Sequence, residues 1–353
     1  MRLKNIFYFI FIILVTVLLF EFIYFFFYKN ISFYNFENRF MLYSSDKSSE
    51  VFVNKKNFVQ YIPNQKIHNK GYYFVNNRWI KEYDYFFKTN NLGLVQNNNV
   101  KKNIPSILFL GDSFLEGQGS EPWFNSFENT YSYKNYQLIN GGFLATGFQQ
   151  WYNLYKNVKE VEGIKINKIA IIFISDDLDR GIFQLDKNTL NCIKDYNVCV
   201  GHEGFYGIPY HDNLNNFLQK MHNARNQSKL TDGNFKKQFK IFFPGTQMLY
   251  SLSRSFIERK KNIEVIKKMI NEFGDNIVFI HLPTKKDIYL DTFEADSKRI
   301  SKIIISLGGN YVNGSKNCFL TKKDFLKYDG HPNKKGYSKI SNCINISLKE
   351  IFH

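Results

Sequence analysis

Residues 106–114, Ser-Ile-Leu-Phe-Leu-Gly-Asp-Ser-Phe, decide the fold of this chain. The four apolar residues 107–110 predict a strand buried on both faces, because no polar residue alternates with them. The strand ends at Gly111, and Ser113 then stands at the head of a helix, where its hydroxyl is exposed and helix amides are close. Ser113 is therefore a candidate nucleophile. The alternative is a helix N-cap without a chemical role.

The same alternation of short apolar runs and helical stretches continues to the end of the chain. Further strands are predicted at residues 137–139, 169–174, 277–280 and, more weakly, 311–312, and helical spacing is found at residues 149–161, 263–273, 295–307 and 334–351. Strands without a polar face that alternate with helices imply a parallel sheet covered on both sides. We therefore expect a flavodoxin-like three-layer α/β/α domain with a central parallel sheet over residues 101–353. An insertion at about residues 178–260 is too long for a plain crossover.

Residues 6–28 are almost continuously apolar. As a helix, this segment would be roughly 34 Å long, enough to cross a bilayer core of about 30 Å. Basic residues precede it, so residues 1–5 are expected in the cytoplasm and the bulk of the chain outside it. A cleaved signal peptide is the rival interpretation, but the segment is long and no small-x-small site follows. We expect one N-terminal transmembrane helix and a single-pass protein of the cytoplasmic (inner) membrane, with a periplasmic or extracellular domain.

Residues 29–100, between this predicted anchor and the α/β domain, are rich in Asn, Tyr and Phe. Residues 71–75 and 83–87 are predicted as strands around a turn at Asn76-Asn77. We expect a stalk followed by a short β-containing lead-in.

The composition excludes several classes of protein. Hydrophobic residues make up 44% of the chain and aromatic residues 18%, which rules out a disordered chain. The net charge of +16 would suit an anionic partner. The basic residues are scattered and form no arm, however, so we do not expect nucleic acid as a partner.

The four cysteines are Cys192, Cys199, Cys318 and Cys343. An even number in an exported chain favours disulfides, and proximity in sequence favours Cys192–Cys199 and Cys318–Cys343, one of three connectivities. The alternative is four buried thiols. No C-x-x-C pair or zinc-type spacing is present, so neither a metal nor a cofactor is expected.

Polar residues follow the predicted strands at the places where chemistry gathers in open α/β sheets. These places are residues 111–114 (Gly-Asp-Ser-Phe), 140–142 (Asn-Gly-Gly) and 175–177 (Ser-Asp-Asp), and Asp329-Gly330-His331-Pro332-Asn333 precedes the last helix. A histidine two residues after an aspartate can act as a base oriented by the carboxylate. Glycine at position 142 allows a backbone N–H to come close to a developing oxyanion.

These blocks, in this order, resemble those of the SGNH, or GDSL, hydrolase superfamily. The resemblance covers roughly residues 106–353, and residues 89–94 also look like the lead-in of membrane-anchored members. It implies that Ser113 is the nucleophile, His331 the general base and Asp329 the residue that orients it. The amides of Ser113 and Gly142 would then form part of the oxyanion hole. The α/β-hydrolase alternative requires a Gly-x-Ser-x-Gly elbow, which is absent around Ser113.

Two positions depart from the family pattern. The family often places its aspartate three residues before the histidine, where this chain has Tyr328, but members acting in alginate and peptidoglycan O-acetylation share the two-residue spacing. In the third block, Asp176 replaces an asparagine that donates to the oxyanion. A carboxylate cannot donate, and losing one such donor typically costs about 100- to 1000-fold in rate. Another donor must then substitute, or Asp176 is protonated or turned away, or the protein is slow.

The resemblance implies an extracytoplasmic serine esterase or O-acyltransferase that acts on acyl, chiefly acetyl, esters of cell-envelope or exported glycans. Its partners would be the glycan or another acyl ester, the membrane and a membrane-bound acyltransferase. One alternative is a catalytically weak glycan-binding or assembly subunit, which Asp176 favours. Another is a lipid-ester hydrolase. His281, which follows the fourth strand, is expected either to contact substrate or to be a packed ring.

Overall fold

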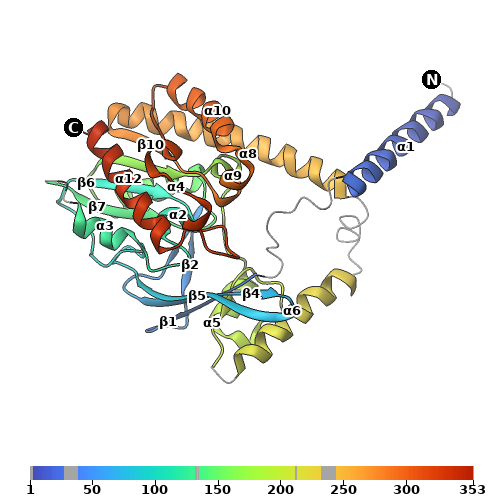
Figure 1. Cartoon of the computed structure of the whole chain (residues 1–353), viewed down its shortest axis with the longest axis horizontal. Coiled ribbons are helices and arrows are strands. Elements are labelled where there is room, and N and C mark those ends of the chain that lie inside the picture. The colour runs from blue at the N-terminus through green and yellow to red at the C-terminus, as the bar shows by residue number, and fades with distance from the viewer. Residues whose placement is uncertain are drawn as a thin grey trace.

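The computed structural model describes residues 3–27, 39–131, 133, 135–210, 213–231 and 244–352. Figure 1 shows three parts: helix α1 (Leu3–Phe27), which projects from the rest of the molecule, an α/β domain, and a smaller β-sheet packed beneath that domain.

The α/β domain is built on a five-stranded sheet in which all neighbouring strands are parallel. Its spatial order is β11-β10-β8-β6-β7, a flavodoxin-like order in which the chain reverses direction beside the first strand. The strands are β6 (Ser106–Gly111), β7 (Gln137–Gly142), β8 (Ile166–Phe173), β10 (Ile277–His281) and β11 (Asn310–Asn313). Every residue of β6 and β10 is buried, as the unbroken apolar runs predicted. The five predicted strands are thus confirmed.

Helices cover both faces of this sheet. One face packs against α4 (Phe148–Lys156), α8 (Pro244–Phe273) and α10 (Phe293–Ser306), and the other against α2 (Ser113–Glu116), α3 (Phe124–Thr130) and α12 (Lys334–Phe352). Short helices α9 (Lys285–Leu290) and α11 (Gly314–Cys318) complete this part of the chain. The architecture is therefore the predicted three-layer α/β/α sandwich.

The lead-in forms a second sheet, in the order β5-β4-β1-β9. Its strands are β1 (Arg39–Ser45), β4 (Lys66–Val75), β5 (Arg78–Lys88) and β9 (Tyr206–Gly207), and a separate hairpin joins β2 (Phe52–Lys55) to β3 (Phe58–Tyr61). The predicted Asn76-Asn77 turn is present, with φ of 49° and 59° in the left-handed region that asparagine tolerates. The predicted stalk would be confined to residues 29–38, which lie outside the described residues.

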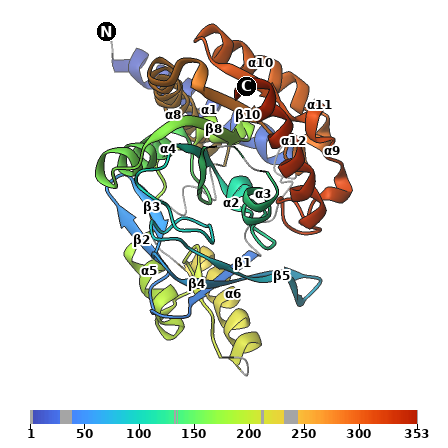
Figure 2. The ribbon, with the colours of Figure 1, turned by 90° about the vertical axis from the view of Figure 1, so that its left-hand side faces the viewer.

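This lead-in sheet is covered on both faces. One face packs against the α/β domain, where Tyr83 and Tyr85 share an apolar cluster with Phe143 and Leu144. The other face packs against α5 (Lys187–Lys194) and α6 (Leu214–Thr231), which belong to the predicted insertion (Figure 2). The insertion therefore completes the lead-in sheet, both through β9 and through these two helices. Residues 232–243 of the insertion are outside the described part of the chain, and its predicted end at 260 falls within α8.

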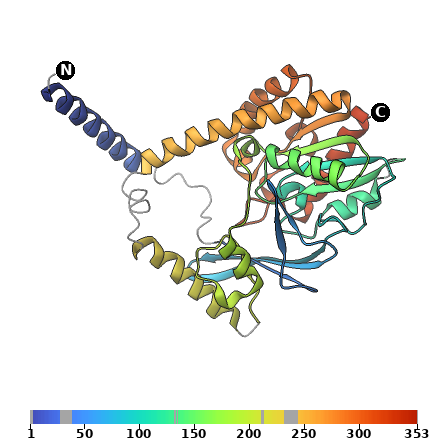
Figure 3. The same ribbon diagram turned by 180° about the vertical axis from the view of Figure 1, so that it is seen from behind.

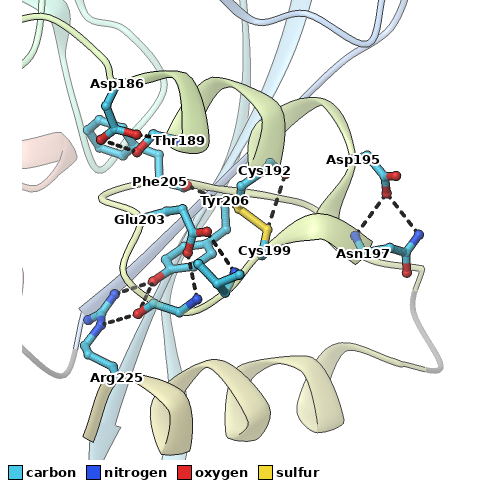
Figure 4. The surroundings of a disulfide bond; sticks show 12 residues. Asp186, Thr189, Cys192, Asp195, Asn197, Cys199, Glu203, Phe205, Tyr206 and Arg225 are labelled. Atoms are coloured by element: carbon cyan, nitrogen blue, oxygen red, sulfur yellow. Dashed lines mark hydrogen bonds between the residues drawn. A yellow bond between two sulfur atoms is a disulfide. The ribbon is translucent and has the colours of Figure 1, made fainter. Parts of the chain in front are cut away.

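Both predicted disulfides are present. Cys192–Cys199 joins the end of α5 to the following loop, and Cys318–Cys343 joins α11 to α12. Figure 4 shows the first bond beside Tyr206, whose hydroxyl accepts a hydrogen bond from Arg225 of α6 at 2.6 Å. The disulfide thus closes a short loop within the insertion, and the hydrogen bond from Arg225 joins α6 to β9.

Helix α1 occupies most of the segment predicted to span a membrane. Among the residues that the structure describes, no helix combines the length and apolar character needed to cross a bilayer, so the transmembrane prediction for residues 6–28 is not confirmed. Glu21 near the end of α1 is buried, and its carboxylate accepts hydrogen bonds from the backbone amides of Gly245 and Thr246, each at 2.6 Å. The first turn of α8 is thereby joined to α1, and the two helices meet end to end (Figure 3).

Candidate active site

Ser113 is the first residue of α2, directly after β6. Asp112 caps this short helix, because its carboxylate accepts the N–H of Phe114 at 2.9 Å. Gly111 must be glycine, since a Cβ there would lie 2.5 Å from the carbonyl oxygen of Ile172 on β8. The sharp turn from strand to helix thus leaves the Ser113 side chain at the carboxyl edge of the sheet.

Three predicted residues form one hydrogen-bonded chain. The Ser113 Oγ lies 2.7 Å from His331 Nε2, and His331 Nδ1 lies 2.5 Å from Asp329 Oδ1. With a carboxylate at Nδ1, the neutral imidazole carries its proton on Nδ1, so that Nε2 accepts from the serine hydroxyl. The structure therefore brings Ser113 together with residues more than two hundred positions later, in the geometry of a nucleophile, a base and an orienting acid.

Asp329 is ionised in this arrangement. Burial opposes its ionisation, but the charge and hydrogen bond of His331, the charge of Arg39 and the hydroxyl of Tyr73 outweigh burial. Together they hold the pKa of Asp329 well below its usual range. An ionised Asp329 can stabilise the imidazolium that forms when His331 takes the serine proton.

The triad opens into a cavity of about 420 Å³. Apolar side chains form part of its wall, and polar and charged groups lie among them. Its lining includes Ser113, Leu144, Ala145, Ile174, Asp176, Arg180, Phe205, Lys286 and His331. A cavity of this size and mixed chemistry fits a small organic group.

The prediction that the Gly142 amide serves the oxyanion hole is wrong. Its N–H donates to Asn140 Oδ1 at 2.9 Å and is therefore already engaged. Glycine is needed here for a different reason: a Cβ would lie 2.5 Å from the backbone nitrogen of Glu116, where α2 packs against β7. Three residues further on, Ala145 lines the cavity with φ of 59°. A left-handed alanine is strained, and residues in such conformations cluster at functional sites.

Asp176 lies in the cavity, as predicted. Burial raises its pKa, while the charges of Arg180 and Lys286 act in the opposite direction. Arg180 is held in place because its Nη1 donates to Asp112 at 2.9 Å and also to Asp177. From the sequence, Arg180 is expected to neutralise part of a polar network at residues 175–180, and in the structure it places a positive charge beside Asp112, which precedes the nucleophile.

The prediction that His281 contacts substrate is wrong, and the alternative of a packed ring is correct. His281 is fully buried and stacks on Phe173, with ring centroids 4.7 Å apart. Its two ring nitrogens are paired with Ser175 Oγ at 3.0 Å and Tyr311 Oη at 2.8 Å. Burial lowers its pKa to about 3, so the ring is neutral.

The sequence analysis missed three residues around the triad. The Tyr73 hydroxyl donates to Asp329 Oδ2 at 2.6 Å, and Arg39 Nη1 lies 3.6 Å from the same oxygen. Glu116, the last residue of α2, is buried, and burial raises its pKa to about 8. The strand prediction for residues 71–75 was the only available signal for Tyr73, and it could not distinguish this tyrosine from its neighbours.

The order of the sheet, the Gly-Asp-Ser-Phe turn and the late Asp-x-His pair resemble those of the SGNH, or GDSL, hydrolase superfamily. No family model matches this sequence, and no curated protein matches it. Among solved structures, the chain is similar to a lipase/acylhydrolase from Enterococcus faecalis, with 15% identity, a TM-score of 0.37, and 70% of this chain and 96% of the other covered.

Two further solved structures are similar to this chain, at comparable identity and TM-score. A member of the lipolytic G-D-S-L family from Veillonella parvula has 12% identity and a TM-score of 0.34, over 70% of this chain and 98% of its own. A catalytic mutant of an acetylxylan esterase from Geobacillus stearothermophilus has 10% identity and a TM-score of 0.34, over 72% of this chain and 96% of its own.

Proposed function

We propose that this protein is a serine esterase or O-acyltransferase that works through an acyl-Ser113 intermediate. The observation that supports the proposal most directly is the hydrogen-bonded chain from Ser113 through His331 to the ionised Asp329, open to a cavity. Each residue has the chemical character that its role requires.

In the first half-reaction, Ser113 Oγ attacks the ester carbonyl while His331 Nε2 takes the serine proton. The backbone amides of Ser113 and Ala145 are the donors available to the oxyanion that forms. When the tetrahedral intermediate collapses, His331 returns the proton to the departing alcohol, leaving the acyl group on Ser113. In the second half-reaction, His331 takes a proton from water or from a second alcohol, which attacks the acyl-serine and releases the acid or a new ester.

We propose acyl esters of glycans, with acetyl the preferred acyl group, as the substrate class. The cavity is small, and Asp176 and Lys286 offer hydrogen-bonding groups suited to sugar hydroxyls beside the nucleophile. These polar groups suit a glycan better than a long hydrocarbon chain. For transfer to a second sugar, the partner would be a membrane-bound acyltransferase or another source of the acyl group.

We also propose that the protein works outside the cytoplasm and is held at the cytoplasmic membrane by its N-terminal segment. All four cysteines are paired in disulfides, which form in oxidising compartments. Helix α1 exposes many apolar side chains, among them Phe9, Phe11 and Leu19. Membrane fractionation of the full chain and of residues 29–353 tests this proposal. Recovery of both in the soluble cytoplasmic fraction, with free thiols, would contradict it.

The second candidate is a catalytically weak glycan-binding subunit, and Asp176 is the observation that favours it. Activity on p-nitrophenyl acetate, acetylated oligosaccharides and p-nitrophenyl palmitate, with Ser113→Ala as control, separates the candidates. Serine labelling by a fluorophosphonate probe adds an assay that needs no substrate. Acetyl-ester turnover lost in Ser113→Ala supports the proposal. Preference for palmitate indicates a lipid-ester hydrolase, and glycan binding without turnover or labelling indicates the binding subunit.

A further inference from the structure

The lead-in sheet contacts both segments that carry the triad. Beside the nucleophile, the N–H of Gly119 donates to the hydroxyl of Tyr85, on β5, at 3.2 Å. Beside the base, the N–H of Tyr328 donates to Glu82 at 3.2 Å. The sheet therefore spans the two loops whose separation sets the distance between Ser113 and His331.

One contact of this sheet reaches the triad itself. The carboxylate of Asp329 uses Oδ1 for His331 and Oδ2 for the lead-in sheet. On Oδ2 it accepts the hydroxyl of Tyr73, from β4, at 2.6 Å, and Arg39, from β1, lies 3.6 Å away. Burial and the neighbouring carboxylate raise the pKa of Tyr73 above its usual range, so the phenol keeps its proton and acts as a donor.

We infer that Tyr73 is a positioning residue of the active site, which fixes the carboxylate of Asp329 so that Oδ1 faces His331. This inference rests on the proposed function. A carboxylate held at one oxygen only can rotate about its Cβ–Cγ bond, and the imidazole it orients then samples unproductive positions. Charge-assisted hydrogen bonds at both oxygens remove that freedom. The lead-in sheet is therefore part of the catalytic apparatus, although the hydrolase motifs lie entirely in the α/β domain.

A purely structural role for Tyr73 is the competing explanation, because its ring also stacks on Tyr328, with centroids 6.1 Å apart. Tyr73→Phe separates the two roles, since it keeps the ring and removes only the hydroxyl. Tyr72→Phe is the matched control. It makes the same change at the adjacent residue of β4, whose side chain packs in the cluster with α5 and α6 on the opposite face of the sheet.

The experiment measures kcat and KM on p-nitrophenyl acetate, the rate of Ser113 labelling by a fluorophosphonate, and the downfield proton resonance of His331 Nδ1. In Tyr73→Phe we expect kcat and the labelling rate to fall by about tenfold, the scale of one hydrogen bond to a charged group. KM should change by less than about twofold, because no group that binds substrate is removed. The Nδ1 resonance should shift. Tyr72→Phe should leave all of these unchanged.

Wild-type kcat and an unshifted resonance in a folded Tyr73→Phe protein would overturn the inference. If Tyr73→Phe does not fold, a chain with 3-fluorotyrosine at position 73 keeps the shape and strengthens the donor, and an unshifted resonance there has the same meaning. A wild-type protein that neither turns over esters nor reacts with the probe contradicts the proposed function instead. The resonance comparison still tests Tyr73 in that case.

Discussion

Glu116 offers the sharpest test of how the site is assembled. It lies three residues after Ser113, is buried, and accepts hydrogen bonds from the Tyr61 hydroxyl at 2.8 Å and the N–H of Leu144 at 2.6 Å. Burial raises its pKa from 4.5 to about 8. The folded protein therefore keeps Glu116 neutral at pH 7, whereas the unfolded chain ionises it.

The sign of the effect follows from this difference. A carboxyl group whose pKa is raised by folding contributes stability that is complete below pH 4.5 and is lost as the pH rises through 8. At 1.36 kcal/mol per pH unit, the full loss is on the order of 5 kcal/mol. Glutamine at position 116 has no proton to lose, and its amide can accept from Leu144 and donate to Tyr61. We therefore expect Glu116→Gln to remove this component of the pH dependence.

Urea unfolding between about pH 5 and pH 9 measures the effect as the difference in unfolding free energy between Glu116→Gln and wild type. This difference should move by several kcal/mol in favour of the variant as the pH rises, because only the wild type loses stability through the ionisation of Glu116. All other titrating groups are the same in both proteins, so their contributions cancel in the difference. Glu121→Gln is the control, since Glu121 is exposed, and its difference from wild type should stay flat. Parallel curves for Glu116→Gln and wild type would refute the reasoning that burial keeps Glu116 neutral.

Three further predictions concern the site and its surroundings. Ser113→Ala and His331→Ala should each leave less than a few per cent of esterase or transferase activity while circular dichroism and Tm stay near wild type; substantial residual activity in either would reject its assignment. Asp176→Asn should lower kcat or weaken glycan binding, because Asp176 interacts with charged neighbours in the cavity; a rise in kcat of roughly tenfold, within what one oxyanion donor supplies, would instead mark the native protein as an attenuated enzyme. Replacing Cys192 and Cys199 by alanine should lower the unfolding free energy by roughly 2.5 kcal/mol, the loop-closure value for a short loop; an unchanged denaturation midpoint would contradict it.

The α/β domain was predictable because its sequence signals are local. An uninterrupted apolar run such as residues 107–110 is stable as a strand that is buried on both faces, as in a parallel sheet. Glycine and asparagine mark where such runs end. The carboxyl ends of parallel strands then meet at one edge. This is why Ser113 and Asp176 could be placed at one edge from the strand pattern, whereas Asp329 and His331 were placed with them through the resemblance of the Asp-x-His block to that of the SGNH hydrolases.

The rest of the site depends on contacts that no local pattern encodes. Residues 39–88 contain six tyrosines, and only the packing of the lead-in sheet on the α/β domain selects Tyr73 for Asp329. Gly142 has the sequence context of a glycine that serves an oxyanion hole, yet its amide N–H donates a hydrogen bond to the side chain of Asn140. Ala145 has a left-handed backbone that its residue type does not indicate. His281 is the last residue of β10, at the same edge of the sheet as Ser113, but its side chain is buried in the packed layer.

The contact between Glu21 and the first turn of α8 has a mechanical consequence. Helix α8 contains 30 residues, so it extends roughly 45 Å as a continuous rod. One end is fastened to α1 by three hydrogen bonds, and the other packs into the sheet that carries the triad. On the proposal that α1 is held at a membrane, a rod of this kind would fix the distance between that surface and the cavity, so that only acyl groups at that distance would be within reach.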